Sequence, residues 1–188
     1  MTTTTTETKP RLAAASTLDA NTTDIGLLIA RVVFGGLLVV HGFQKLFGWF
    51  DGPGLEANNA GFEAMGYNPG ALFGTLAALS EVGGGLLLLL GLATPLAAAI
   101  VIGTMINAIN ATWANGLFGA VGAQGWQPGY ELALLFGAVG VALAFTGAGR
   151  YSLDHGRPWQ RQGVVIGAGA VALGVVAAVL TLILKWVL

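Results

Sequence analysis

The stretch LLIARVVFGGLLVVHGFQK, residues 27–45, decides the fold. It is apolar over the length of a membrane-spanning helix, yet it carries Arg31, His41 and Lys45. At about 100° per residue, these three side chains lie within about 80° of one another on a helical wheel. A charge at the centre of a membrane helix costs about 2.5–3.5 kcal/mol on insertion scales. The sequence therefore predicts that other polar groups of the chain face this stripe.

The composition places the chain in a membrane. Of its 188 residues, 55% are apolar and only 9% are charged, whereas a soluble domain carries about 25% charged residues. The net charge of −1 and the lack of a basic block argue against nucleic acid as a partner. Cysteine is absent, so disulfides and thiol redox chemistry by this chain are excluded.

The order of apolar runs and breakers predicts an all-α, polytopic helical bundle. Residues 1–24 are predicted to be a disordered cytoplasmic tail, and residues 51–70 and 114–129 to be loops. A four-helix membrane domain is expected over residues 25–156, and an additional C-terminal transmembrane helix within residues 157–188. The expected spans are Ile25–Phe50, Ala71–Leu92, Leu96–Trp113, Tyr130–Thr146 and Val164–Leu184.

Basic residues predict the orientation. With the N-terminus inside, one group of them falls on the cytoplasmic side: Lys9, Arg11, Arg150, Arg157 and Arg161. The two outer loops then contain no lysine or arginine. This asymmetry follows the positive-inside rule, so we expect a cytoplasmic N-terminus and an external C-terminus.

Counting from the outer interface at about 1.5 Å per residue places several polar side chains at similar depth. His41, Glu81 and Asn107 form one layer, and Lys45, Asn110 and Glu131 form a second layer nearer the surface. Lys45 and Glu81 can neutralise each other in a low-dielectric setting, and Glu131 is a rival partner for Lys45. Arg31 lies near the cytoplasmic end, where we expect it to snorkel or to pair with Asp154 or Asp24.

Two interpretations of this cluster remain open. In the first, ion pairs and amides only hold the bundle in register. In the second, they form a polar pocket in the outer half of the bundle, suited to a quinone headgroup or another small ligand. His41 or Lys45 would then bond a carbonyl oxygen, and Glu81 would tune or relay a proton. Bis-histidine haem ligation does not fit, because His41 and His155 fall at opposite ends of the bundle; no metal site is predicted.

The residues resemble the DoxX family. The most specific part of the resemblance is Gly147-x-Gly149-Arg150-Tyr151-Ser152-Leu153-Asp154, after the fourth span. The rest of it consists of Arg31-x3-Gly35-x5-His41-Gly42-x2-Lys45, Glu81-x2-Gly84 with Gly91, and Glu131-Leu132. The resemblance covers residues 25–156. Ser152 and Asp154 also have a local explanation as capping or turn residues, with Arg150 anchored at the lipid headgroups.

The resemblance implies a four-helix unit in the cell membrane of a bacterium, here followed by a fifth helix. It implies a membrane subunit of an oxidoreductase system, quinone as a ligand and no covalently bound cofactor. It also implies soluble or membrane redox partner proteins beside the lipid bilayer; the oligomeric state stays open. Two other functions are kept: a non-catalytic scaffold that recruits partner proteins, and, ranked last, a small-solute carrier.

Overall fold

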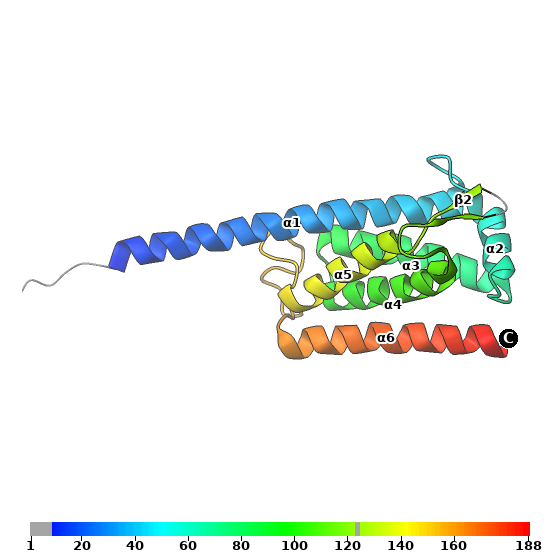
Figure 1. The fold of residues 1–188 in the computed structure, drawn as a ribbon. Helices are drawn as coiled ribbons and strands as arrows, with labels where there is room; N and C mark the ends of the chain where they lie inside the picture. The colour runs from blue at the N-terminus through cyan, green and yellow to red at the C-terminus, as the bar shows by residue number, and fades with distance from the viewer. Residues whose placement is uncertain (1–8, 123–124) are drawn as a thin grey trace, which may run out of the picture.

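Figure 1 shows the computed structural model of the chain, which describes residues 9–122 and 125–188. The fold is an all-α bundle with one small antiparallel hairpin. Its helices are α1 (Lys9–Phe47), α2 (Gly54–Ala64), α3 (Gly70–Leu90), α4 (Thr94–Thr112), α5 (Glu131–Thr146) and α6 (Val164–Val187). A short 3-10 helix, η1 (Trp113–Asn115), precedes the hairpin strands β1 (Ala120–Gly122) and β2 (Gly125–Gln127).

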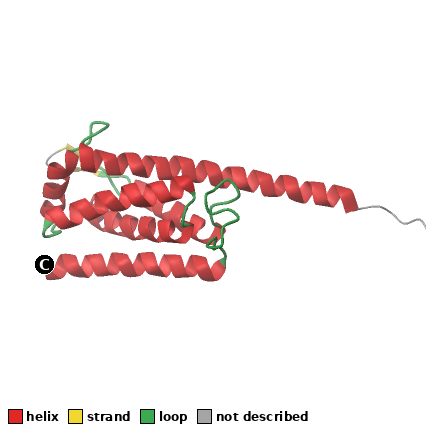
Figure 2. Cartoon of the chain, turned by 180° about the vertical axis from the view of Figure 1, so that it is seen from behind, coloured by secondary structure: helices red, strands yellow, loops and turns green. Residues whose placement is uncertain are grey.

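Within the described residues, four helical segments are long and apolar enough to cross a membrane: Ala20–Phe47, Gly70–Leu90, Thr94–Asn115 and Val164–Val187. The predicted polytopic all-α bundle is therefore confirmed. α5 differs from the prediction, because its 16 residues extend only about 24 Å at 1.5 Å per residue, against a hydrocarbon core of about 30 Å. Figure 2 shows that α6 runs beside the bundle, with the loops between α5 and α6 at the end from which α1 projects.

Two segments predicted to lack regular structure are helical. α1 begins at Lys9, so residues 9–24 belong to a helix that projects beyond the bundle (Figure 1) and not to a disordered tail; residues 1–8 lie outside the described residues. The loop predicted over 51–70 contains α2, which lies across the opposite end of the bundle (Figure 1). The side-chain N–H of the buried Asn58 donates a hydrogen bond to the Gly74 carbonyl oxygen at 3.0 Å and so holds α2 against α3.

α1 and α3 pack through glycines. A Cβ at Gly35 would lie 2.7 Å from the Leu89 nitrogen, and one at Gly85 would lie 2.8 Å from the Gly35 oxygen. A Cβ at Gly42 would meet the Ala78 oxygen and the Val82 nitrogen at 2.9 Å. Small residues of this kind let membrane helices approach closely and gain van der Waals contact. Any larger side chain at these positions would push the two backbones apart.

α6 packs against α4 in a similar way. A Cβ at Gly103 would lie 3.1 Å from the Gly174 oxygen, and one at Gly174 would lie 2.7 Å from the Ala99 oxygen. A buried cluster formed by Ala98, Ala144 and Ala170 joins α4, α5 and α6. The C-terminal helix is therefore an integral wall of the bundle.

The turn between α3 and α4 is held by a buried arginine. Arg31 is only 1% exposed and donates to the carbonyl oxygens of Leu88 at 3.4 Å, Leu89 at 3.0 Å and Tyr151 at 2.6 Å. Leu88 and Leu89 lie in the last turn of α3, where carbonyls lack helical partners and favour a cation. The expectation that Arg31 snorkels is wrong, because the loop that supplies Tyr151 covers it. Asp154 attracts the Arg31 guanidinium electrostatically, but the two form no direct ion pair among the described residues.

Asp154 binds the other side of the same turn. Its carboxylate accepts the Ala93 and Thr94 backbone N–H groups at 2.9 Å each, the Thr94 hydroxyl at 2.7 Å and the Trp159 indole N–H at 3.0 Å. An anion at the N-terminus of α4 is favoured by the helix dipole. Burial raises the pKa of Asp154, but these hydrogen bonds outweigh burial and hold the pKa below its ordinary value.

Arg150 and Ser152 complete the docked loop. The Arg150 backbone N–H donates to Asp24 at 2.9 Å, and its guanidinium bonds Asn21 at 3.2 Å, so Arg150 attaches the loop to α1. The Ser152 hydroxyl donates to the Gly149 oxygen at 2.6 Å and closes the turn. These residues therefore act locally on the fold at the end of the bundle where α1 projects.

We predict that Asp154→Asn lowers the free energy of unfolding by about 1–3 kcal/mol, because the amide nitrogen faces donors that need an acceptor. The folded pKa of Asp154 is lowered, so its stabilisation is complete above about pH 4, the ordinary value for aspartate, and is lost as the pH falls through the folded value. Unfolding in detergent, followed by tryptophan fluorescence between pH 3 and 7, measures both effects. A stability difference that grew at acid pH would contradict this assignment.

Candidate functional site

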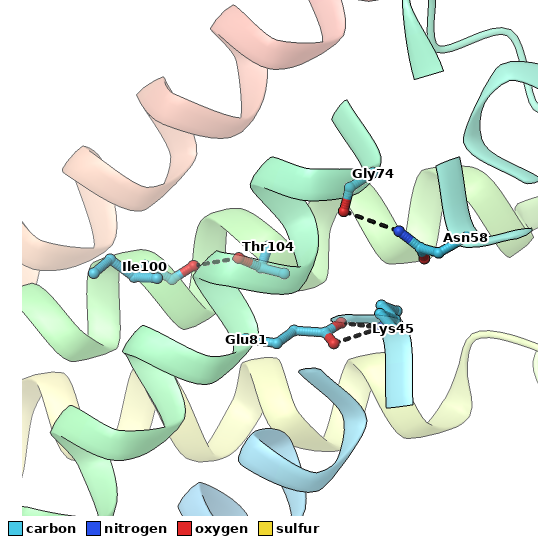
Figure 3. Close-up of polar contacts among 6 residues, drawn as sticks. All are labelled: Lys45, Asn58, Gly74, Glu81, Ile100 and Thr104. Carbon is cyan, nitrogen blue, oxygen red and sulfur yellow. Dashed lines mark hydrogen bonds and ion pairs between the residues drawn. The ribbon is translucent and has the colours of Figure 1, made fainter. Parts of the chain in front are cut away.

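The intramembrane ion pair lies between α1 and α3. The Lys45 Nζ contacts both carboxylate oxygens of Glu81 at 2.5 Å (Figure 3). The Glu81 side chain is only 7% exposed and that of Lys45 is 26% exposed. The close packing at Gly42, one helical turn before Lys45, brings the two helices near enough for this contact. In this low-dielectric environment an unpaired charge is costly, and the ion pair neutralises both side chains.

A cavity of about 410 Å³ opens beside the ion pair. We call it the α2-side cavity, because α2 and the α2–α3 loop cover one end of it. Small-molecule sites in proteins commonly have volumes of about 300–1,000 Å³. Its lining residues come from five elements and connecting loops: Lys45, Phe62, Met65, Tyr67, Phe73, Leu76, Ala77, Ser80, Glu81, Ala99, Ile100, Gly103, Thr104, Asn107, Ala108, Ala111, Thr112, Ala177, Ala178 and Thr181.

Most of this lining is apolar, and its polar groups are few. Tyr67 is 1% exposed, and its hydroxyl makes long 3.4 Å contacts with the Asn107 carbonyl and the Asn110 Oδ1. The Lys185 Nζ, near the end of α6, lies 4.1 Å from the centre of the Tyr67 ring. This cation–π contact ties the C-terminal helix to the loop that covers the cavity.

The structure brings together only some of the predicted site residues. Lys45, Glu81 and Asn107 line the α2-side cavity, and their part in ligand binding stays a prediction. The other three predicted residues, His41, Asn110 and Glu131, do not line it. The His41 ring packs edge-on against Phe136 of α5, with ring centres 6.0 Å apart.

Glu131 is not the partner of Lys45. It is exposed at the start of α5, and Lys45 pairs with Glu81. Asn110 is exposed near the end of α4 and touches the site only through Tyr67. Sequence position predicts depth in the membrane, but depth alone does not fix the direction in which a side chain points.

Several lining residues could have been found from the sequence. Thr104, Asn107, Ala108 and Ala111 follow a helical spacing of three and four residues, so they form a stripe of small and polar residues on α4. Ala177, Ala178 and Thr181 form a similar stripe on α6. Two such stripes indicate helix faces that pack against each other, since small residues let membrane helices approach closely.

The fold and this site define a polytopic helical membrane protein with an intramembrane ion pair beside a cavity. A family model described as DoxX matches residues 26–115, which run from α1 to the end of η1. Over these residues the chain belongs to the DoxX family. The match ends before α5, the docked loop and α6, so the α6 wall of the cavity lies outside it. No curated protein and no solved structure matches the chain.

We predict that Lys45→Met and Glu81→Gln each destabilise the bundle by about 3 kcal/mol, because each leaves a largely buried charge without its partner. The double variant should recover most of this loss. Unfolding of the four proteins in a double-mutant cycle measures the coupling.

Arg150→Met with Asp24→Asn is the control cycle. That pair is 3.7 Å apart and Arg150 is 53% exposed, so its coupling should stay below about 1 kcal/mol. Additive losses at Lys45 and Glu81 would contradict the tight pairing of these two charges.

Proposed function

We propose that this DoxX-family protein is a membrane subunit of a quinone-linked redox system, and that the α2-side cavity binds the quinone headgroup. The observation that carries the proposal is the combination of an ion pair and a mostly apolar wall in one cavity of about 410 Å³. A quinone is an amphiphile with a polar ring and a long apolar chain, so it requires this combination. The membrane itself supplies the ligand.

The polar side chains of the cavity fit a quinone headgroup. A quinone ring presents two oxygen atoms, and when bound it supplies two-electron, two-proton redox chemistry. The Lys45 ammonium can donate a hydrogen bond to one quinone oxygen, and the Glu81 carboxylate can accept a proton from a hydroxyl group of the reduced ring. If Glu81 takes that proton, the Lys45 ammonium is balanced by the negative charge left on the ring oxygen, so no lone buried charge results.

Partner proteins complete this proposal. The chain has no cysteine, so any thiol chemistry in the system belongs to a partner. We place the N-terminus in the cytoplasm and the α2 end of the bundle at the outer face of the cell membrane, in accordance with the distribution of basic residues. The part of α1 that projects beyond the bundle (Figure 1) would then lie on the cytoplasmic side, where soluble redox proteins are found.

A second candidate function is a scaffold without a ligand. One observation favours it: Lys45 contacts both oxygens of Glu81, so the pair already satisfies itself. In that case the cavity would contain only lipid, and the protein would act through its partners alone.

We predict that the protein, purified in mild detergent with its lipids, carries quinone that organic extraction and mass spectrometry detect. Ala108→Phe should remove most of this quinone, because Ala108 lines the α2-side cavity and is partly buried there. Ala142→Phe is the matched control, since Ala142 is exposed on α5 and does not line the cavity.

The extraction separates the two candidates. Quinone in the wild type and in Ala142→Phe, but not in Ala108→Phe, supports the quinone site. Equal quinone in all three proteins would rule out the α2-side cavity as the site. Partner proteins without any quinone in the wild type would support the scaffold.

A further inference from the structure

The three threonine hydroxyls that line the α2-side cavity share one feature, which is that each donates to its own helix. Thr104 donates to the Ile100 oxygen, Thr112 to the Ala108 oxygen and Thr181 to the Ala177 oxygen, all at 2.9 Å. Figure 3 shows the first of these bonds beside the ion pair. A threonine hydroxyl has one hydrogen and two lone pairs. Once the hydrogen is committed to the backbone, the oxygen offers only lone pairs to a ligand.

Two other polar side chains, Asn107 and Tyr67, also have acceptor atoms that no described residue uses fully. The Asn107 amide nitrogen donates to the Gly103 oxygen at 3.0 Å, while its Oδ1 is buried without a hydrogen-bond partner among the described residues. The Tyr67 hydroxyl points its hydrogen toward Asn107 and Asn110. Tyr67 therefore also offers an acceptor, and Asn107 has one unpaired acceptor, Oδ1, beside a second amide N–H.

Donors are scarce by comparison. Lys45 directs its ammonium at both oxygens of Glu81 and keeps one hydrogen of three for a ligand. Ser80 lines the cavity and forms no hydrogen bond to another described residue, so it is free to donate or accept. The acceptors of the cavity are more numerous: they include the carboxylate of Glu81 and the hydroxyl oxygens of three threonines. The hydrogen-bonding capacity of the cavity is dominated by acceptors.

We propose that the α2-side cavity selects the hydroxyl-bearing, reduced form of its ligand, a hydroquinone, over the oxidised quinone. This inference rests on the proposed function. A hydroquinone brings two O–H donors, which the threonine oxygens and Glu81 accept. A quinone brings two carbonyl acceptors, which lose their hydrogen bonds to water and find few donors in the cavity. The site would therefore bind the reduced member of the quinone pool more tightly.

The test measures binding of two redox forms of one ligand. The full chain in lipid nanodiscs is equilibrated under anaerobic conditions with 2-decyl-1,4-naphthohydroquinone or 2-decyl-1,4-naphthoquinone, and the excess over empty nanodiscs is quantified. The dimethyl ether of the hydroquinone is a third probe, with a similar shape and no O–H group. We expect the hydroquinone to bind at least about tenfold more tightly than the other two, as a site built to accept a hydroxyl discriminates strongly against its absence.

Thr104→Val tests the assignment of the acceptor. Valine has nearly the same shape and removes the lone pairs, so the hydroquinone preference should fall by about tenfold while quinone binding changes little. Thr146→Val is the matched control, because Thr146 makes the same bond to its own helix, to the Ala142 oxygen at 3.0 Å, and does not line the cavity. It should leave the preference unchanged.

Each result decides something. Tighter binding of the hydroquinone, reduced by Thr104→Val and not by Thr146→Val, supports the inference. Equal binding of both redox forms, or tighter binding of the quinone, overturns the inference and leaves the proposed quinone site intact. Binding of neither form would overturn the proposed function and the inference with it.

Discussion

α1 and α3 meet with almost no space between their backbones, and both ends of the bundle depend on this contact. Gly35, Gly42 and Gly85 leave no room for a Cβ, so the two antiparallel helices lie in register over several turns. The same register places Arg31 against the last carbonyls of α3 and Lys45 against Glu81. In a membrane there is no hydrophobic gain from burying apolar helices against each other. Close packing and polar contacts therefore decide the arrangement.

Arg31 and Lys45, the two basic residues of α1 within the bundle, have different roles at the two ends of the bundle. Arg31 neutralises the C-terminus of α3, and Asp154 neutralises the N-terminus of α4 on the other side of the same tight turn. Their hydrogen bonds join the ends of α3 and α4 to the loop that contains Tyr151, so the two residues act as a structural clamp. Lys45 and Glu81 border a cavity of ligand size. The stripe on α1 thus contains one charge that holds the fold and one that faces a space a ligand can occupy.

The sequence is sufficient for the membrane class and the principal spans, because length and composition determine these. It narrows the partner of Lys45 to Glu81 or Glu131, and the structure selects Glu81. The sequence is insufficient for features set by distant contacts. The carbonyl of Tyr151 reaches Arg31 only after the loop folds back, and α2 is held by the bond from Asn58 to α3. His41 lies one turn from Lys45 and yet packs against Phe136. Helical spacing predicts the direction of a side chain around its helix axis, but the packing of neighbouring helices determines which residues it contacts.

We propose that the ion pair of α1 and α3 contacts a quinone headgroup. Redox-induced infrared difference spectroscopy on nanodiscs loaded with 2-decyl-1,4-naphthoquinone tests it directly, since a carboxylate in contact with the ring changes its vibration when the ring is reduced. We expect a carboxyl band in the wild-type difference spectrum that is missing from the double variant with Lys45→Met and Glu81→Gln. Identical difference spectra for the two proteins would contradict the claim.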